Sequence, residues 1–441
     1  MKTDGILSTV STIMCICISA LTLLSSCGGG TPGNVESTGA VREVLEGKRT
    51  EANAAWWGFN ETDATDALQS AIHSGAMKVI VPDMGKDWIV RPIQLAGDQE
   101  IVFEKGVVVA AKKGEFKGRG DCLFRGAGIS GLTLRGYGAT LRMQKQDYMS
   151  DAYEKAEWRM VIGLYSCNDV EILGMTLRDS GGDGIYLGVS GDQIYCSNIH
   201  IKDVTCDNNY RQGISVISAE NLLIEDCTLK NTWGTPPAAG IDLEPNHAEE
   251  QMTDCIIRNC VMENNEGAGI LIYLRPLSAE SEDVSILFEN CRVTSAKGSG
   301  LIVGAIKDDG PMGSIEFSNC KIENTAKVGA QVYDKSADRA RVRFTKCTWK
   351  NTALDAVGNE PPSPLWIYLR RPELTRRHGG IDFIDCTLED IENRPFLTAT
   401  EKESAFGVYD ITGKITVRNP YGAIMYLGAK SEGITLEIGE L

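Results

Sequence analysis

The stretch "IIRNCVMENN", residues 256–265, carries a spacing that returns along most of the chain. Ile257 lies three positions before Cys260, and Met262 lies two positions after it. Asn264 follows four positions after the same cysteine. This register recurs at intervals of 23 to 39 residues around eight anchors: Met175, Val204, Cys227, Cys260, Cys291, Cys320, Cys347 and Cys386. Such a repeat predicts stacked coils, each of which buries its apolar edge only against its neighbours.

The repeat also predicts what each column of the stack contains. Matching positions of neighbouring parallel coils lie about 4.8 Å apart, so like side chains form ladders. We expect the aliphatic, aromatic and cysteine columns to fill the interior. The polar fourth column, with Asn231, Asn264 and Asn324, marks a turn, because asparagine tolerates left-handed backbone. The predicted fold class is therefore all-β, a solenoid of parallel strands.

A single helix is expected before the coils, in "TDATDALQSAIHSGA", residues 62–76. Leu68 and Ile72 fall on one stripe, and Thr62 or Asp63 can cap its start. Short β-rich runs follow it. In this order, a capping helix and then stacked coils, the chain resembles the pectin lyase-like superfamily. The resemblance implies a right-handed parallel β-helix with an N-terminal capping helix.

The N-terminal residues predict export. Residues 1–27 have the length and order of a signal peptide, and "LLSSC" ends the apolar run at Cys27. That ending resembles the lipobox of bacterial lipoproteins, which implies a lipid on Cys27 and a chain held at a bacterial membrane, periplasmic or on the cell surface. An ordinary membrane-anchor helix is the alternative. We expect residues 28–40 to be a flexible tether and residues 41–441 to form a single β-helix domain.

Composition excludes several other classes of protein. The chain of 441 residues has 60 Asp and Glu against 44 Lys and Arg, and no basic run that would indicate nucleic-acid binding. Without Cys15, Cys17 and Cys27, eleven cysteines remain, six of them in the inward column. They are interpreted as small buried hydrophobic residues rather than disulfides. The absence of Cys-x-x-Cys spacing and the presence of only four histidines argue against a zinc site.

Polar residues gather on the strand that follows each turn, over about four coils or roughly 15–20 Å of a groove. The candidate catalytic residues are Asp183 in "SGGDGIYLG" and the pair Asp242 and Glu244 in "AAGIDLEPN". The candidate substrate-binding residues are Arg159, Tyr210, Arg211, Trp233, His247, Tyr273 and Arg275.

The strand "SGGDGIYLG" is similar to the Asn-Thr-Asp-Gly strand of polygalacturonase-like hydrolases. By that resemblance Asp183 would be a catalytic carboxylate. The family's next two strands, with Asp-Asp and Gly-His-Gly, are replaced by "RQGISVI" and "AAGIDLEPN". The resemblance therefore carries over the location of the groove but not polygalacturonase activity.

Three functions remain open from the sequence. The first is a glycoside hydrolase, since Asp242 and Glu244 have Cα atoms about 6.6 Å apart on one strand face and such carboxylates can act as acid and base. The second is a lyase or epimerase of uronic-acid polysaccharides, with Arg211 or Tyr210 as base and arginines over the substrate carboxylate. The third is a non-catalytic glycan-binding surface lipoprotein, in which Asp242, Glu244 and Asn246 hold Ca²⁺ or nothing. No cofactor is predicted, and the expected partners are a poly- or oligosaccharide and, through the lipid, a membrane.

Overall fold

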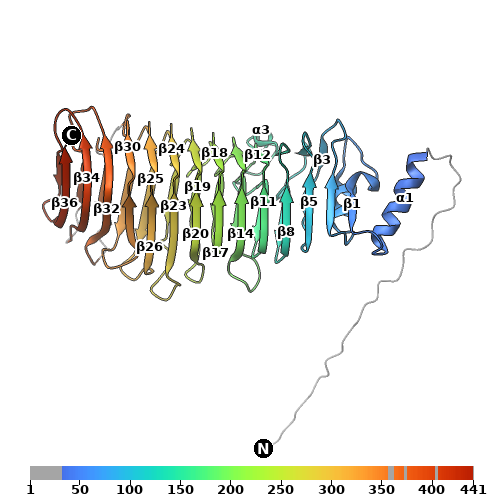
Figure 1. Ribbon diagram of the computed structural model, residues 1–441, viewed down its shortest axis with the longest axis horizontal. Coiled ribbons are helices and arrows are strands. Elements are labelled where there is room, and N and C mark those ends of the chain that lie inside the picture. Colours follow the sequence, from blue (N-terminus) through green and yellow to red (C-terminus); the bar gives the residue numbers. More distant parts are fainter. Residues whose placement is uncertain (1–31, 356–361, 372–374, 403–405, 441) are drawn as a thin grey trace, which may run out of the picture.

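The computed structural model describes residues 32–355, 362–371, 375–402 and 406–440. Its coils stack side by side along the long axis of the molecule (Figure 1). A typical coil has three strands, such as β14 (Cys196–Lys202), β15 (Thr205–Asp207) and β16 (Ile214–Val216). Each strand pairs in parallel with its counterparts in the coils before and after it. The all-β parallel solenoid predicted from the repeat is confirmed.

The strands form one sheet of 24 and one of 12. The larger sheet consists of two ladders joined at the C-terminal end, where β32 (His378–Glu389) pairs with both β29 and β30. Its first ladder is β1 (Glu51–Asn53), β2 (Lys78–Val81), β5 (Gln99–Phe103), β8 (Ser130–Arg135), β11 (Asn168–Leu173), β14, β17 (Ala219–Glu225), β20 (Met252–Arg258), β23 (Val284–Glu289), β26 (Gly313–Ser318), β29 (Arg341–Thr345), β32, β34 (Val408–Arg418) and β36 (Glu432–Glu440). Its second is β3 (Trp88–Val90), β6 (Val108–Ala111), β9 (Thr140–Arg142), β12 (Thr176–Arg178), β15, β18 (Thr228–Lys230), β21 (Val261–Glu263), β24 (Arg292–Thr294), β27 (Lys321–Glu323) and β30 (Thr348–Lys350).

The twelve-stranded sheet carries the candidate site. In spatial order its strands are β4 (Ile93–Gln94), β7 (Phe124–Ala127), β10 (Ile162–Tyr165), β13 (Ile185–Gly188), β16, β19 (Ile241–Leu243), β22 (Ile270–Tyr273), β25 (Leu301–Ile306), β28 (Ala330–Lys335), β31 (Leu365–Leu369), β33 (Leu397–Glu401) and β35 (Met425–Leu427). Alternate residues of each strand point into the bore and out of the sheet, so residues two apart share a face.

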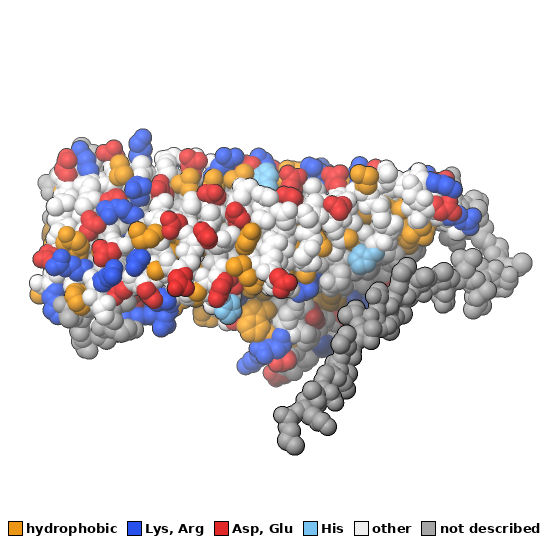
Figure 2. Space-filling view, turned by 90° about the horizontal axis from the view of Figure 1, so that it is seen from below, with side chains coloured by type: hydrophobic (Ala, Val, Ile, Leu, Met, Phe, Trp, Pro, Cys, Tyr) orange, Lys and Arg blue, Asp and Glu red, His pale blue; other side chains and the backbone are white. Residues whose placement is uncertain are grey.

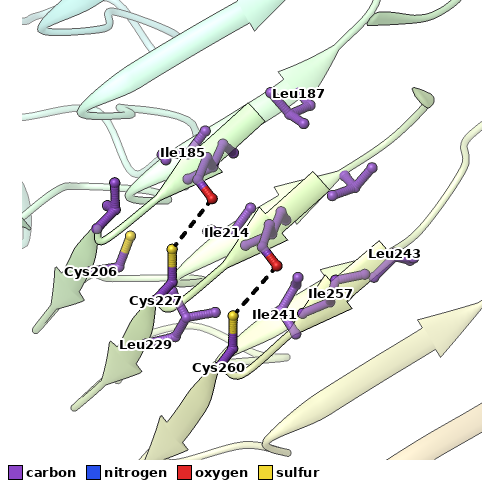
Figure 3. Packing of buried hydrophobic residues seen from close by; sticks show 14 of the residues in the cluster. Ile185, Leu187, Cys206, Ile214, Cys227, Leu229, Ile241, Leu243, Ile257 and Cys260 are labelled. Atoms are coloured by element: carbon purple, nitrogen blue, oxygen red, sulfur yellow. Dashed lines mark hydrogen bonds between the residues drawn. The ribbon is translucent and has the colours of Figure 1, made fainter. Parts of the chain in front are cut away.

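The interior is built from the predicted ladders. Cys227 and Cys260 are buried one coil apart, and their thiols donate to backbone carbonyls of the preceding coil at 3.7 Å (Figure 3). Phe317 stacks between Phe288 and Phe344, with ring centroids 5.3 and 5.1 Å apart. All eleven cysteines among the described residues are free and buried, which confirms their interpretation as core residues.

The turn column adopts the predicted left-handed backbone, but its side chains are not buried. Asn264 has φ of 52°, and its exposed amide donates to Asn231 Oδ1 at 2.8 Å. The buried amide is one residue later. Asn265 is 1% exposed, its Oδ1 accepts from the backbone N–H of Thr232 at 3.0 Å, and its Nδ2 donates to the carbonyl of Leu229 at 3.0 Å. The buried hydrogen bonds of this turn are therefore made by Asn265, the residue after the ladder position, and not by Asn264 of the ladder itself.

Two N-terminal predictions need correction. The tether expected over 28–40 is wrong from residue 32 onward, because helix α1 spans Pro32–Leu45. This helix packs against the short helix η1 (Ala54–Trp57) and buries Val44, so its apolar residues have a surface to cover. Residues 1–31, with Cys27, lie outside the described residues. Within the described part of the chain, no helix is long and apolar enough to cross a membrane.

The helix expected over 62–76 is present but shorter, as α2 (Thr65–Ile72). Ala64 is its N-cap residue, while Asp63 Oδ1 accepts from the backbone N–H of Thr65 at 3.1 Å. A further short helix, α3 (Lys145–Tyr148), lies in the insert that precedes β10.

Candidate active site

The candidate site is centred on three neighbouring strands of the twelve-stranded sheet. Tyr186 of β13, Ser215 of β16 and Asp242 of β19 are in register, so their side chains form one outward column. Glu244 follows the end of β19, where its backbone N–H donates to the carbonyl of Val216 at 2.9 Å. This hydrogen bond continues the parallel register by one more outward position.

Four ionisable residues meet on these strands or just beyond their ends, and we call Asp183, Arg211, Asp242 and Glu244 the groove cluster. Arg211 Nη1 lies 3.6 Å from Asp183 Oδ2, and Arg211 Nη2 lies 3.5 Å from Glu244 Oε2. Gln212 Nε2 donates to Asp242 Oδ2 at 2.6 Å. The coil that carries Arg211 and Gln212 thus ties together carboxylates from the coils on either side of it.

The carboxylates of the groove cluster are unusually deprived of water. Asp183 and Asp242 are both fully buried. Burial raises the pKa of Asp183 well above its ordinary value, although Arg211 opposes the shift. Burial also raises the pKa of Asp242 to about 7, with Arg211 again opposing and Glu244 adding to the shift. The pKa of Glu244 is raised by its partial burial. Protons are therefore available in this site near neutral pH.

Hydrogen bonding does not satisfy these carboxylates within the part of the chain that the structure describes. Neither oxygen of Asp183 has a hydrogen-bond partner there, nor has Oδ1 of Asp242. Burying such acceptors unpaired costs free energy that a purely structural position would avoid. Strained electrostatics of this kind is common at functional sites.

Neither Arg211 nor Tyr186 is suited to act as a base. Although burial acts to lower the pKa of Arg211, the surrounding Asp183 and Asp242 carboxylates raise it, so the guanidinium stays charged. Burial raises the pKa of the Tyr186 phenol, and the charge of Asp183 adds to this shift. The lyase alternative therefore loses one of its two suggested bases.

The insert before β10 and the loop before β19 stand beside the groove cluster. Lys145 lies with its ammonium 3.8 Å from the centre of the Trp233 ring, and Thr235 donates to Glu157 Oε2 at 3.2 Å. Trp233, Pro237 and Ala238 help to line a hollow of about 390 Å³. Glu157 adds a fourth carboxylate to the field around Arg211.

Arg159 was placed in the groove from the sequence, and the structure corrects this. It is fully buried, with Nε donating to the carbonyl of Phe116 at 2.9 Å and a terminal nitrogen donating to that of Glu154 at 3.0 Å. Its guanidinium also contacts Tyr148 and Tyr153, whose rings meet edge to face at 5.1 Å. These contacts hold the insert on the solenoid and engage the Arg159 guanidinium outside the groove cluster.

The other predicted binding residues surround the cluster to different extents. Tyr273 extends outward from β22, one coil beyond Glu244. Tyr210 packs against Gly234 in the loop before β19, and Trp233 donates from Nε1 to Asn208 Oδ1 at 2.6 Å. His247 and Arg275 are exposed, on loops beyond the ends of β19 and β22. Tyr273 therefore faces the groove, and the remaining four lie around its rim.

Sequence reasoning missed Gln212 and Tyr186. The repeat could have identified Gln212, because it occupies the position of Asp183 one coil later. The backbone carbonyl of Gln212 accepts from the backbone N–H of Gly184, which fixes this register. The same alternation that singled out Asp242 also applies to Tyr186.

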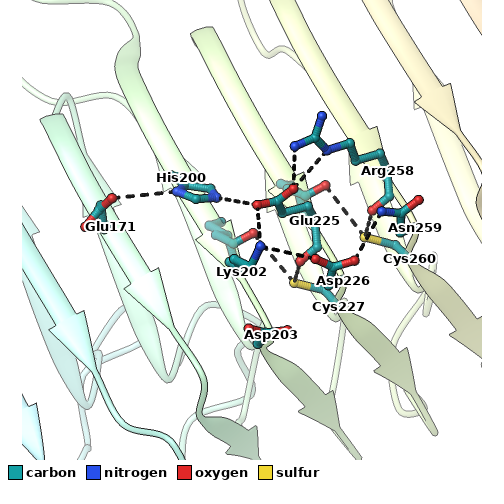
Figure 4. A network of polar contacts seen from close by, with 12 residues as sticks. Glu171, His200, Lys202, Asp203, Glu225, Asp226, Cys227, Arg258, Asn259 and Cys260 are labelled. Carbon is teal, nitrogen blue, oxygen red and sulfur yellow. Dashed lines mark hydrogen bonds and ion pairs between the residues drawn. The ribbon is translucent and has the colours of Figure 1, made fainter.

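A second polar cluster lies on the first ladder of the larger sheet (Figure 4). We call Glu225, His200, Lys202 and Arg258 the flank cluster. Glu225 accepts from Lys202 at 2.9 Å and from two nitrogens of Arg258 at 2.8 and 2.6 Å, and His200 Nε2 lies 3.0 Å away. Hydrogen bonds from Lys202 and Arg258 lower the pKa of Glu225 to about 2. Its carboxylate is fully paired, which favours a structural role.

Comparison with known proteins identifies the architecture. A family model described as a right handed β-helix region matches residues 159–348. The chain has a right-handed parallel β-helix fold. This is the fold that the resemblance drawn from the sequence implies. Comparison of the sequence with curated proteins gave no match.

Several solved structures share this fold at low sequence identity. A surface adhesin of Streptococcus pneumoniae is similar with a TM-score of 0.56 and 13% identity, covering 89% of this chain and 91% of the adhesin. The family 28 exopolygalacturonase of Yersinia enterocolitica gives 0.52 and 13%, over 89% and 78% of the two chains. The A-module of an Azotobacter vinelandii mannuronan C-5 epimerase gives 0.50 and 14%, over 87% and 99%. The same β-helix fold is therefore found in an exopolygalacturonase, an epimerase and an adhesin.

Among the described residues, no group of three or more His, Cys, Asp or Glu side chains is arranged to hold a metal ion.

Proposed function

We propose that the protein is a glycoside hydrolase whose acid and base are carboxylates of the groove cluster. The observation that carries this proposal is the state of Asp242, a fully buried carboxyl with a pKa of about 7 beside a second carboxyl. A carboxylic acid that keeps its proton near neutral pH is what protonation of a leaving glycosidic oxygen requires.

The roles follow from exposure and charge. Asp242 is the proton donor, because it is the buried partner of the pair. Glu244 is 30% exposed and faces Arg211, so it ionises more readily and serves as the base or nucleophile. The two terminal nitrogens of Arg211 lie beside the carboxylates of Asp183 and Glu244, one on each.

The solved structures with this fold support a glycan ligand but differ in chemistry. One is named as an exopolygalacturonase, one as a mannuronan epimerase and one as an adhesin. The charged state of Arg211 favours hydrolysis over a lyase that uses this residue as base. Tyr210 is left as the alternative base.

Incubation with a panel of plant, algal and bacterial polysaccharides tests the proposal. Release of reducing ends without the ultraviolet absorbance of unsaturated uronates is the expected result. Products that carry that absorbance would instead identify a lyase. Retention of a glycan without any product would identify a binding protein and refute hydrolysis.

We also propose that the chain is exported and anchored through a lipid on Cys27, on the strength of "LLSSC" at the end of the apolar N-terminal run. Cys27→Ser should release the protein from membranes of a bacterial host or leave an unprocessed precursor. Fractionation identical to that of the wild type would refute the anchor.

A further inference from the structure

The outward columns of the groove cluster continue along the sheet into a different set of side chains. The column of Asp242 runs through Leu271 and Ile302 to Gln331 and Trp366. The column that follows Glu244 runs through Tyr273, Gly304, Tyr333 and Tyr368. From β19 to β31 is four coils, or roughly 19 Å at 4.8 Å per coil. One uninterrupted sheet face therefore joins the carboxylates to a group of aromatic rings.

We call Tyr333, Trp366 and Tyr368 the aromatic panel. The rings of Trp366 and Tyr368 are parallel within 8° at 3.9 Å, and those of Tyr333 and Tyr368 lie 5.7 Å apart at 29°. Gly304 leaves room for Tyr333, because a Cβ there would come within 2.2 Å of its ring. Trp366 and Tyr368 remain partly exposed. The panel therefore presents aromatic surface to the groove.

Beside this panel, Arg370 and Arg371 both pair with one buried carboxylate, that of Asp334. Asp334 is 1% exposed and accepts from Arg370 Nε at 3.0 Å, while Arg371 Nε lies 3.2 Å from the same oxygen. The Arg370 guanidinium also lies 4.5 Å from the centre of the Tyr333 ring. Two positive charges thus share one negative charge, and the side chain of Arg370 remains 43% exposed.

The charge balance of the groove therefore changes sign along its length. Around Arg211 the acids are in excess, whereas around Asp334 the bases are in excess. Figure 2 shows that acidic and basic side chains are interspersed over one face of the solenoid. A ligand for the second region needs both a flat apolar face and a negative charge, because rings stack on the former and guanidinium groups bind the latter.

We propose that the aromatic panel, with Arg370 and Arg371, binds the acidic sugar residues of a glycan that lies along the twelve-stranded sheet. A sugar ring that bears a carboxylate or sulfate has the required combination of an apolar face and a charge. The binding itself does not depend on hydrolysis at the groove cluster. If both proposals hold, the acidic end of the glycan lies about four coils from the bond that is cleaved.

The test measures binding of the full chain by isothermal titration calorimetry. The probes are oligogalacturonate, oligomannuronate and a sulfated glycosaminoglycan oligosaccharide, with a neutral cello-oligosaccharide of matched length. At least one acidic probe should bind in preference to the neutral one. Arg370→Gln should raise its Kd about tenfold or more, because a charge-assisted contact is lost. The matched control, Arg292→Gln, removes an arginine of β24 that pairs with Glu323 on another face, and should leave the Kd unchanged.

Trp366→Phe provides a second readout, since the change in tryptophan fluorescence on binding should largely disappear. Circular dichroism establishes that each variant is folded, and the exposed Arg370 keeps the test decisive should the Trp366 variant fail to fold. The proposal is overturned if none of the acidic probes binds, if the neutral probe binds as tightly, or if Arg370→Gln and Arg292→Gln bind alike. Acidic binding in a protein that cleaves nothing would refute the hydrolase alone.

Discussion

The groove cluster and the flank cluster use the same residue types with opposite balance. In the groove cluster one cation, Arg211, faces an excess of carboxylates, and the pKa of Asp242 rises to about 7. In the flank cluster one carboxylate, Glu225, faces an excess of cations, and its pKa falls to about 2. Both clusters sit on neighbouring coils of the same solenoid.

The difference between the clusters shows how a functional polar cluster can be distinguished from a structural one in a repetitive fold. A carboxylate with its hydrogen bonds satisfied by cations stabilises the folded state and gives up no proton near neutral pH. A buried carboxylate whose hydrogen bonds are only partly satisfied destabilises the fold and keeps a proton that chemistry can use. Counting charged residues would not distinguish the two clusters.

The largest expected effect separates the clusters by activity. Asp242→Asn should fold and lose at least about a hundredfold in rate, because the proton donor is gone. Glu244→Gln and Asp183→Asn should each cause a loss of the same order. Glu225→Gln is the matched control and should keep the wild-type rate. Steady-state assays on the glycan found by panel screening provide the measurement, and full activity in all three groove variants would contradict the site.

The next effect is on stability, with a sign set by the raised pKa of Asp242. Between the ordinary pKa of an aspartate and about 7, the folded state binds more protons than the unfolded state, so stability falls as pH rises. Above about pH 7 the wild type carries the whole free-energy cost of the buried charge, so Asp242→Asn should be more stable by about 4 kcal/mol. That advantage should vanish near about pH 4. Urea unfolding at both pH values measures it, and an Asn variant less stable at high pH would contradict burial of the charge.

The buried, uncharged amide of Asn265 should have an effect on stability that lies between the effects of the two charged clusters. Asn265→Ala should cost roughly 1–3 kcal/mol, because the backbone N–H of Thr232 and carbonyl of Leu229 lose their partner. Asn324→Ala removes an amide of the exposed ladder and should cost less, mainly through its left-handed backbone at φ of 55°. Thermal unfolding compares the two. Equal costs would mean that exposed and buried amides of the turn contribute alike.

The smallest effect is expected in the flank cluster. Glu225→Gln should destabilise the protein by about 1 kcal/mol at neutral pH, since its partners are partly exposed to solvent. The pKa of Glu225 is lowered, so its contribution is fully present above about pH 4.5 and is lost as pH falls toward 2. The difference from the wild type should therefore fade in acid, as it does for Asp242→Asn, but with the opposite sign, because Glu225→Gln lowers stability. Unfolding followed across this pH range checks the sign.

The repeat predicted most of the fold because each column of a solenoid reports on the same environment many times. The inward cysteines, the phenylalanine stack and the turn asparagines all follow from registers such as Phe317–Cys320–Asn324. The exposure of the asparagine ladder was not predictable, since spacing indicates a turn but not which side of the turn faces water. Helix α1 was also missed, because its glycine- and serine-containing stretch reads as a flexible linker, whereas in the structure it packs against η1.

The candidate site was partly predictable for the same reason. Alternation placed Asp242, Glu244 and Arg211 outward, and the structure brings them together with Asp183. Arg159 was misassigned because its side chain belongs to an insert whose path no repeat constrains. A guanidinium that caps backbone carbonyls and one that faces a ligand look alike in sequence.

The most direct test of the central account is the proton affinity of Asp242, which needs no substrate. Carbon-13 labelling of aspartate carboxyls, followed by NMR across pH, would resolve a carboxyl that titrates near about 7 rather than below about 5. We predict that this signal is present in the wild type, absent in Asp242→Asn and unchanged in Glu225→Gln. If every aspartate of the wild type titrates below about 5, the groove cluster holds no proton near neutral pH and the acid–base account is wrong.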